Sequence, residues 1–300
     1  MNRSQLILVM IAGLILASFT VDKKLGLKHA KKTLEGFCAY IPSGYSYLEG
    51  DTTSIQAFYM SSTEITNQQY NEFLDDLLRM GELEKYAIAK IDTTGWNTFL
   101  PNTSMEPMAS YYHRHPAYQN YPVVNVSKEG AELFCDWLTK QYDSLSNGEM
   151  PLKFRLPLRS EWTYAASGGK RAVWYSWGGP YLRDSKGCIL ANYLSVGSEN
   201  ITRDPETGHL KIAHDLLKVD NDGAMHTAPA KSYNKNDYGL YNMNGNVSEL
   251  IADGDYAVGG DWYSPGYDIR IQSIKEISKP QPTVGFRVVA SFLGREIEQK

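Results

Sequence analysis

The 300-residue sequence predicts an α+β fold that is rich in irregular loops. A short apolar stretch bounded by Pro and Gly comes first, segments with helical periodicity follow, and the second half holds short apolar stretches between turns. Because helices and strands occupy different parts of the chain instead of alternating, the order favours α+β over repeated βαβ units. Residues 168–236 show almost no helical periodicity, and so long an irregular stretch needs something to hold it in place.

The first residues have the features of an export signal. A basic start precedes an apolar run at residues 6–16, and Lys23 and Lys24 follow. This pattern is typical of a secretory signal peptide. No small-x-small cleavage site follows, so a cleaved leader at residues 1–22 and an uncleaved membrane tether through residues 6–21 both stay open. We expect an exported protein in the periplasm or cell envelope of a bacterium, with a linker at residues 23–36 and one domain at 37–295.

Helical periodicity is clearest in two segments. In "TNQQYNEFLDDLLRM" Thr66 is the expected N-cap, and the apolar stripe consists of Tyr70, Phe73, Leu74, Leu77 and Leu78. A second helix is expected to begin at Ser127, with a buried face of Ala131, Phe134, Cys135 and Leu138. A third, shorter helix is expected at "RLPLRSEWTYAA". The stretches "CAYIPSG", "YAVGGDWY" and "VGFRVVA" are typical of strands.

Composition excludes some classes of function. With 30 basic and 34 acidic residues the net charge is −4, and no basic cluster suggests nucleic-acid binding. Cys38, Cys135 and Cys188 form neither a disulfide framework nor a CxxC metal site. The 21 Tyr and 6 Trp residues fit two interpretations, aromatic filler in a loop-rich fold or a surface for a carbohydrate or peptide.

Two histidines lie close together in "YYHRHPAY". In a strand, His113 and His115 would point to the same side. Two imidazoles supply half of a zinc or iron site, so further ligands would have to come from elsewhere in the chain. A pair of surface histidines in a loop is the simpler interpretation.

Several stretches, taken in order, resemble the formylglycine-generating-enzyme (sulfatase-modifying factor) domain family. They are "YIPSG", "STEITNQQYNEFL", "YPVVNVSKEGAELFCDWL", "RLPLRSEWTYAASGG", "WYSWGG", "LAN", "HTAPAKSYNKNDYGLYNMNGNVSEL", "VGGDW" and "VGFRVV", and they span roughly residues 38–290. The resemblance implies the fold of that family, a C-type-lectin-like α+β domain that calcium often stabilises.

The resemblance also implies two structural calcium sites. In the family the stretch matching "NDYGLYNMNGNVSEL" wraps a calcium ion, and its ligands fall here on Asn242, Gly245, Val247 and Glu249. The other site maps onto Asn192, Tyr193, Asp222 and Ala224. Calcium takes six to eight oxygen ligands from carboxylates, amides and carbonyls, which suits such a loop. The alternative is a hydrogen-bonded turn in which Asn side chains bond to the backbone.

The sequence departs from the family where catalysis occurs. The family's copper-binding cysteine pair falls on Ser264 and Ile269. Soft thiolates suit Cu(I), whereas a serine hydroxyl stays protonated and isoleucine has no donor atom. The disulfide partner that the family provides for Cys135 falls on Val288, and the Thr that caps the third helix is Leu158. We therefore expect no bound copper and a member of a non-catalytic branch.

The insertion "GWNTFLPNTSMEPMASYYHRHPAYQNYPVVNVS" resembles a subgroup tied to gliding motility and type IX secretion, whose members are non-catalytic envelope proteins. Those proteins are usually lipid-anchored, and no cysteine follows the apolar run here. The leading hypothesis is an exported scaffold that binds another envelope protein or a glycan. The alternatives are a metal-dependent oxidase with a relocated site near His113 and His115, and a glycan-binding module that uses Trp174, Trp177 and Trp262.

Overall fold

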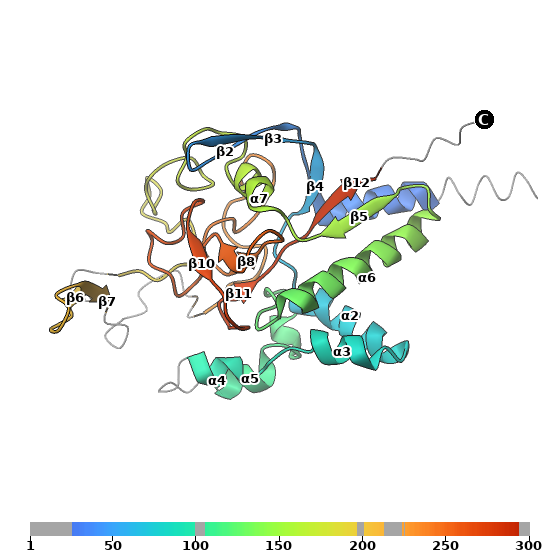
Figure 1. The fold of residues 1–300 in the computed structure, drawn as a ribbon, viewed down its shortest axis with the longest axis horizontal. Helices are drawn as coiled ribbons and strands as arrows, with labels where there is room; N and C mark the ends of the chain where they lie inside the picture. The colour runs from blue at the N-terminus through green and yellow to red at the C-terminus, as the bar shows by residue number, and fades with distance from the viewer. Residues whose placement is uncertain (1–25, 100–105, 197–200, 213–223, 225, 294–300) are drawn as a thin grey trace, which may run out of the picture.

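The computed structural model describes residues 26–99, 106–196, 201–212, 224 and 226–293 (Figure 1). The predicted leader at residues 1–22 and the predicted calcium ligand Asp222 lie outside the described residues. Within the described part, no helix is both long and apolar enough to cross a membrane.

The first described residues form a helix, which corrects the predicted linker. Residues 26–37 are helical, with Ala30 and Leu34 buried in the main core. The hydroxyl of Tyr142 donates a hydrogen bond to the Ala30 carbonyl. The polar composition of this segment suggested a linker, but an apolar residue every fourth position is enough to bury one helical face.

The main sheet has four strands in the order β1-β4-β12-β5. All neighbours are antiparallel, and Ala290 of β12 lies opposite Tyr59 of β4 and Phe154 of β5. The strands are β1 (Cys38–Ile41), β4 (Phe58–Ser61), β5 (Leu152–Arg155) and β12 (Val289–Phe292). The main core joins buried side chains of this sheet with those of α2 (Asn67–Arg79) and α6 (Lys128–Ser146). Figure 1 shows α6 running beside β5.

A second sheet carries the residues of greatest functional interest. Its order is β10-β9-β8-β11, and β11 runs parallel to β8. The strands are β8 (Ser248–Leu250), β9 (Tyr256–Val258), β10 (Ile274–Glu276) and β11 (Val284–Gly285). Two hairpins complete the strands, β2 (Gly44–Leu48) with β3 (Asp51–Ile55) and β6 (Ile201–Arg203) with β7 (Leu210–Ile212).

The two long predicted helices are confirmed. Thr66 and Gln69 form a reciprocal capping box at the start of α2, and the Ser127 hydroxyl accepts a hydrogen bond from the Gly130 amide in α6. Leu78 differs from the prediction because it is 44% exposed, at the edge of the buried stripe. Shorter helical segments are α3 (Leu83–Ala89), α4 (Gly95–Phe99), α5 (Glu106–Tyr111) and η1 (Pro116–Tyr118).

The third predicted helix, α7 (Arg159–Ala166), is capped by an acidic residue from a distant segment. Leu158 occupies the N-cap position and provides no side-chain acceptor. The Asp253 carboxylate accepts from the Arg159 amide at 2.8 Å, and Glu161 accepts from the Leu158 amide at 2.9 Å. Together they accept hydrogen bonds from N–H groups at the start of the helix, the role that the hydroxyl of a capping Thr has in other helices. The described part of residues 168–236 contains strands and turns, and the mixed architecture confirms the predicted α+β class.

Candidate functional site

The two positions that match the family's cysteine pair lie in the loop after β9. The Ser264 hydroxyl accepts a hydrogen bond from the Asp261 amide at 3.2 Å, and the Ser264 carbonyl accepts from the Leu194 amide at 2.9 Å. Ile269 is fully buried in a cluster with Tyr175 and Tyr193. Its side chain fills core space and has no donor atom. The residues at these two positions therefore do not fit a cuprous ion.

One buried carboxylate of this loop, Asp261, is already paired. Asp261 is fully buried, and its Oδ2 atom lies 2.6 Å from Lys275 Nζ and 2.9 Å from Ser248 Oγ. Lys275 also donates to Thr283 Oγ1 at 2.7 Å. These contacts connect β8 and β10 to the loop. Because Asp261 is held by a cation and a hydroxyl, it acts as a structural anchor beside the lost cysteine positions.

Glu249, the predicted calcium carboxylate, forms a buried ion pair. Its two oxygens accept from Arg287 Nε and Nη2, each at 2.6 Å, and Oε2 also accepts from Trp162 Nε1 at 2.6 Å. Glu249 and Arg287 are 1% and 0% exposed. The pairing of β8 with β11 brings these distant residues together, since Glu249 lies opposite Gly285. The guanidinium thus supplies the positive charge that the carboxylate needs.

A second buried carboxylate lies close to this ion pair. Glu64 is fully buried and accepts from Asn246 Nδ2 at 2.8 Å and from Asn242 Nδ2 at 3.2 Å. Burial raises the pKa of Glu64 to about 8, although Arg287 nearby lowers it in part and Glu249 raises it further. Two buried carboxylates therefore lie near a single guanidinium, which is paired with Glu249. Because its pKa is about 8, the Glu64 side chain is mainly in its neutral form near pH 7.

These contacts decide the fit of calcium at the Glu249 site. Asn242 donates its amide to Glu64 and to the Ala230 carbonyl, and its Oδ1 atom is buried with no partner within the described residues. Gly245 and Val247 lie in the predicted tight loop. However, both oxygens of Glu249, the only charged ligand expected, point to Arg287. In this arrangement the site does not fit a calcium ion.

Gly245 explains why the predicted loop needs glycine at that point. Its φ is +77°, and a Cβ atom there would collide with the carbonyl of Asn192. The backbone N–H of Asn246 donates to that same carbonyl at 2.8 Å. The two predicted calcium loops are therefore adjacent in the fold, as close backbone approach at a glycine allows.

The other predicted calcium site is only partly described. Asn192 and Tyr193 are buried, Ala224 is half-buried, and Asp222 lies outside the described residues. The Asn192 amide donates to the His226 carbonyl at 2.6 Å and to Asn246 Oδ1 at 3.2 Å. Asn192 Oδ1 is buried and has no hydrogen-bond partner among the described residues. An unpartnered buried oxygen fits a cation ligand, so calcium at this second site stays a prediction.

The two histidines do not form a shared site. His113 is 4% exposed, and its Nε2 atom accepts from Trp96 Nε1 at 3.3 Å. Burial lowers the pKa of His113 to about 3, so the ring is neutral. His115 is exposed and accepts from the Ala117 amide, because the segment is a turn and not a strand. Among the described residues, no group of three His, Cys, Asp or Glu side chains is placed to hold a metal.

The tryptophans predicted for sugar stacking have different environments. Trp174 is 52% exposed, and the Arg270 guanidinium lies 5.4 Å from its ring centroid. Trp177 stacks on Tyr175 at 4.8 Å, whereas Trp262 is 5% exposed and packs against Trp96. The three rings therefore do not form one exposed surface.

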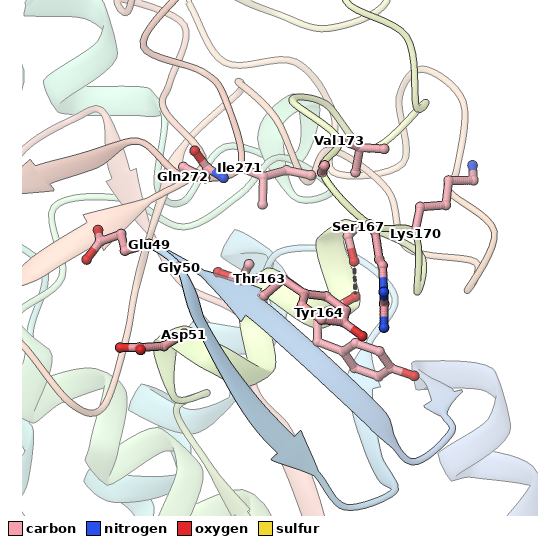
Figure 2. Close-up of a pocket in the computed structure, with 13 residues that line it drawn as sticks. Glu49, Gly50, Asp51, Thr163, Tyr164, Ser167, Lys170, Val173, Ile271 and Gln272 are labelled. Atoms are coloured by element: carbon pink, nitrogen blue, oxygen red, sulfur yellow. Dashed lines mark hydrogen bonds between the residues drawn. The ribbon is translucent and has the colours of Figure 1, made fainter.

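The structure also contains a pocket that sequence reasoning missed. It has a volume of about 300 Å³ and lies between the β2–β3 hairpin and α7 (Figure 2). Its walls come from residues 47–51, residues 163–167, residues 170–173, and Ile271 with Gln272. No motif joins these segments in the sequence, so no sequence pattern predicts this pocket.

Comparisons with known proteins agree with the fold. The structure of PvdO from Pseudomonas aeruginosa matches with a TM-score of 0.52 at 16% identity, covering 85% of this chain and 94% of that one. Treponema denticola variable protein 1 matches with a TM-score of 0.50 at 18% identity, covering 84% and 94%. At such identities the matches show the fold alone.

The sequence comparison identifies the family. The profile of the sulfatase-modifying factor enzyme 1-like domain matches residues 49–292. The chain therefore belongs to the formylglycine-generating-enzyme (sulfatase-modifying factor) domain family, which confirms the predicted fold.

Individual relatives differ in activity. Formylglycine-generating enzyme of Mus musculus is 25% identical over 217 residues, covering 67% of this chain and 50% of the enzyme. The enzyme of Streptomyces coelicolor is 32% identical over 151 residues, covering 49% and 34%. Inactive C-alpha-formylglycine-generating enzyme 2 of Bos taurus is 23% identical, covering 66% and 60%. The chain spans about half the length of the mouse relative.

Proposed function

We propose that this chain is a non-catalytic member of its family that uses the scaffold for binding or assembly. The observation that carries the proposal is the pair of residues at the cysteine positions. Ser264 is hydrogen-bonded to its own loop, and Ile269 is fully buried among aromatic side chains. Restoring a copper site would require two changed side chains and a reorganised core.

Family membership alone does not decide activity, because relatives include proteins named as active enzymes and one named as inactive. The argument therefore depends on the site itself. The buried carboxylates Glu249 and Asp261 are held by Arg287 and Lys275, and His113 and His115 lie in separate environments. These contacts favour binding over a relocated catalytic centre.

Oxygen consumption tests this proposal directly. Purified protein would be reconstituted with Cu(I) and supplied with oxygen and a cysteine-containing peptide, with the Streptomyces coelicolor enzyme as the positive control. We expect no stoichiometric copper binding, no oxygen consumption and no aldehyde in the peptide. Copper-dependent turnover by this chain would overturn the proposal.

The proposed location is the bacterial periplasm or cell envelope, with either a cleaved leader or a tether through residues 6–21. The basic start and the apolar run at residues 6–16 support export. The insertion at residues 95–127 supports a role in gliding motility or type IX secretion, where the partner would be another envelope protein or a glycan. Cell fractionation with a C-terminal tag should place the protein outside the cytoplasm. Recovery in the cytoplasm alone would contradict the location.

A further inference from the structure

Two surface loops place aromatic side chains around one arginine. The guanidinium carbon of Arg270 lies 3.3 Å from the ring centroid of Tyr267 and 5.4 Å from that of Trp174. Tyr267 and Trp174 are 69% and 52% exposed, so each ring keeps an open face toward solvent although the guanidinium lies against it. We call Trp174, Tyr267 and Arg270 the aromatic–arginine surface.

The two loops that carry this surface are fixed to each other. The backbone N–H of Ile271 donates to the Trp174 carbonyl at 2.9 Å, and the Tyr175 hydroxyl donates to the Gly266 carbonyl at 2.8 Å. Ile269 and Tyr175 anchor the loops in one buried cluster. Because the rings stand on a packed base, a ligand loses little affinity to the ordering of these side chains.

The guanidinium of Arg270 has donors available to a ligand. Its Nε atom donates to the Tyr267 carbonyl at 3.0 Å, which fixes its orientation. Within the described part of the chain, no carboxylate lies within ion-pair distance of Arg270. Its two terminal nitrogens therefore remain as a pair of donors that matches the two oxygens of a carboxylate. Asp268, two residues before Arg270, is exposed and adds a negative charge nearby.

These features indicate the chemistry of the ligand. Open aromatic rings stack on the C–H faces of sugar rings, and a guanidinium binds a carboxylate. An extended peptide would need a strand edge for its backbone, but residues 174–181 and 265–271 contain turns and bends without a β-strand. A neutral sugar would leave the donors of Arg270 unused. A glycan that contains a sugar acid uses both the rings and the guanidinium.

We propose that the aromatic–arginine surface binds an acidic glycan. The carboxylate of a uronic acid pairs with Arg270, and neighbouring sugar rings stack on Trp174 and Tyr267. This inference rests on the proposed binding role and names its ligand class. The two fail independently, because copper-dependent turnover would refute the non-catalytic role without changing glycan binding, and absence of glycan binding would leave the copper result unchanged.

Calorimetric titration with matched probes tests the ligand class. Tetragalacturonate and a hyaluronan tetrasaccharide provide sugar rings with carboxylates, their methyl esters provide the same rings without charge, and tetraglutamate provides charge without rings. We expect at least one acidic glycan to bind at millimolar concentrations or below, and its ester and tetraglutamate to bind about tenfold more weakly. Equal binding of tetraglutamate would assign the surface to acidic peptides and overturn the proposal, as would absence of binding by both glycans.

Variants of the surface assign the contacts. Arg270→Gln should weaken binding of the acidic glycan by about tenfold, because it removes the charge-assisted hydrogen bonds. Trp174→Ala should also weaken binding, whereas Trp174→Phe keeps an aromatic ring and should retain most of the affinity. Asp268→Asn should strengthen binding, because it removes a negative charge beside the site of the ligand carboxylate.

Two controls match these variants in residue type. Arg114 and Tyr111 are an exposed arginine and an exposed tyrosine outside the aromatic–arginine surface, so Arg114→Gln and Tyr111→Ala should leave affinity unchanged. Circular dichroism verifies that each variant is folded. Unchanged affinity in Arg270→Gln, or equal losses in the controls, would overturn the proposal.

Discussion

Three ionisable side chains, Glu64, Glu249 and Arg287, are buried together in the centre of this molecule. Glu249 and Arg287 form a bidentate pair with both distances at 2.6 Å. A buried pair adds little stability over a well-packed apolar alternative, but removing one partner leaves the other charge without compensation. A substitution that removes only one partner of the pair should therefore lower the free energy of unfolding strongly.

Replacing Glu249 with Gln should destabilise the protein by about 3–5 kcal/mol, since Arg287 would keep its charge at a fully buried position without a compensating carboxylate. Urea unfolding followed by circular dichroism measures the loss. Glu276→Gln is the control, because Glu276 is exposed on β10 and should change stability by less than about 0.5 kcal/mol. A similarly small effect of Glu249→Gln would contradict the buried ion pair.

Glu64 should make the stability depend on pH. Its pKa is raised from 4.5 to about 8 in the folded state, so the folded protein binds the proton more tightly than the unfolded chain. The contribution of Glu64 is fully present below pH 4.5 and is lost as the pH rises through about 8. The difference in unfolding free energy between the wild type and Glu64→Gln should therefore decrease from pH 5 to pH 8. A pH-independent difference would rule out protonation of Glu64.

At the level of elements, α7 connects two parts of the molecule. Its first turn receives Asp253 from the β8–β9 connection, and Arg159 at its start holds the β2–β3 turn through Glu49. The Trp162 side chain on the same helix donates to Glu249. One short helix thus positions the hairpin wall of the pocket and a member of the buried charge cluster.

Removing the distant cap should weaken α7. Asp253→Ala takes away the carboxylate that accepts from the Arg159 amide, and a lost N-cap acceptor costs about 1 kcal/mol. Thermal unfolding should show a lower Tm. Asp255→Ala is the matched control, because its side chain is 96% exposed and lies 3.9 Å from Lys128. Equal effects of the two variants would show that Asp253 does not act as a cap.

For the whole molecule, calcium is the ligand whose effect on stability distinguishes the two predicted sites. An ion that binds only the folded state raises Tm by mass action. We expect added calcium to raise Tm in the wild type and in Glu249→Gln, and EGTA to reverse the increase. The variant Asp222→Ala should abolish the response.

Two other outcomes of the calcium titration would change the assignment of the sites. Loss of the calcium response in Glu249→Gln would place the ion at Glu249 despite Arg287. No response in the wild type would remove calcium from both predicted sites.

Local sequence patterns predicted the helices whose first turns are capped by residues nearby in the sequence. The α2 and α6 helices begin where Thr66 and Ser127 can accept hydrogen bonds from residues three positions ahead. The helix at residues 26–37 was predicted to be a linker, because its buried face consists of only a few small or apolar residues. Its stability comes from packing against the main core, which composition does not reveal.

The sequence alone determined that positions 264 and 269 provide no thiolate ligand, because serine and isoleucine lack sulfur in any fold. The sequence also determined the family and the loop that contains Glu249. Only the tertiary structure decided that Arg287, 38 residues further along, takes both oxygens of that carboxylate. The same holds for the pocket, whose walls come from four separate segments. The physical reason is that the caps of α2 and α6 form between residues three positions apart, whereas the cap of α7 and the charge pairing in the buried interior depend on which distant segments meet.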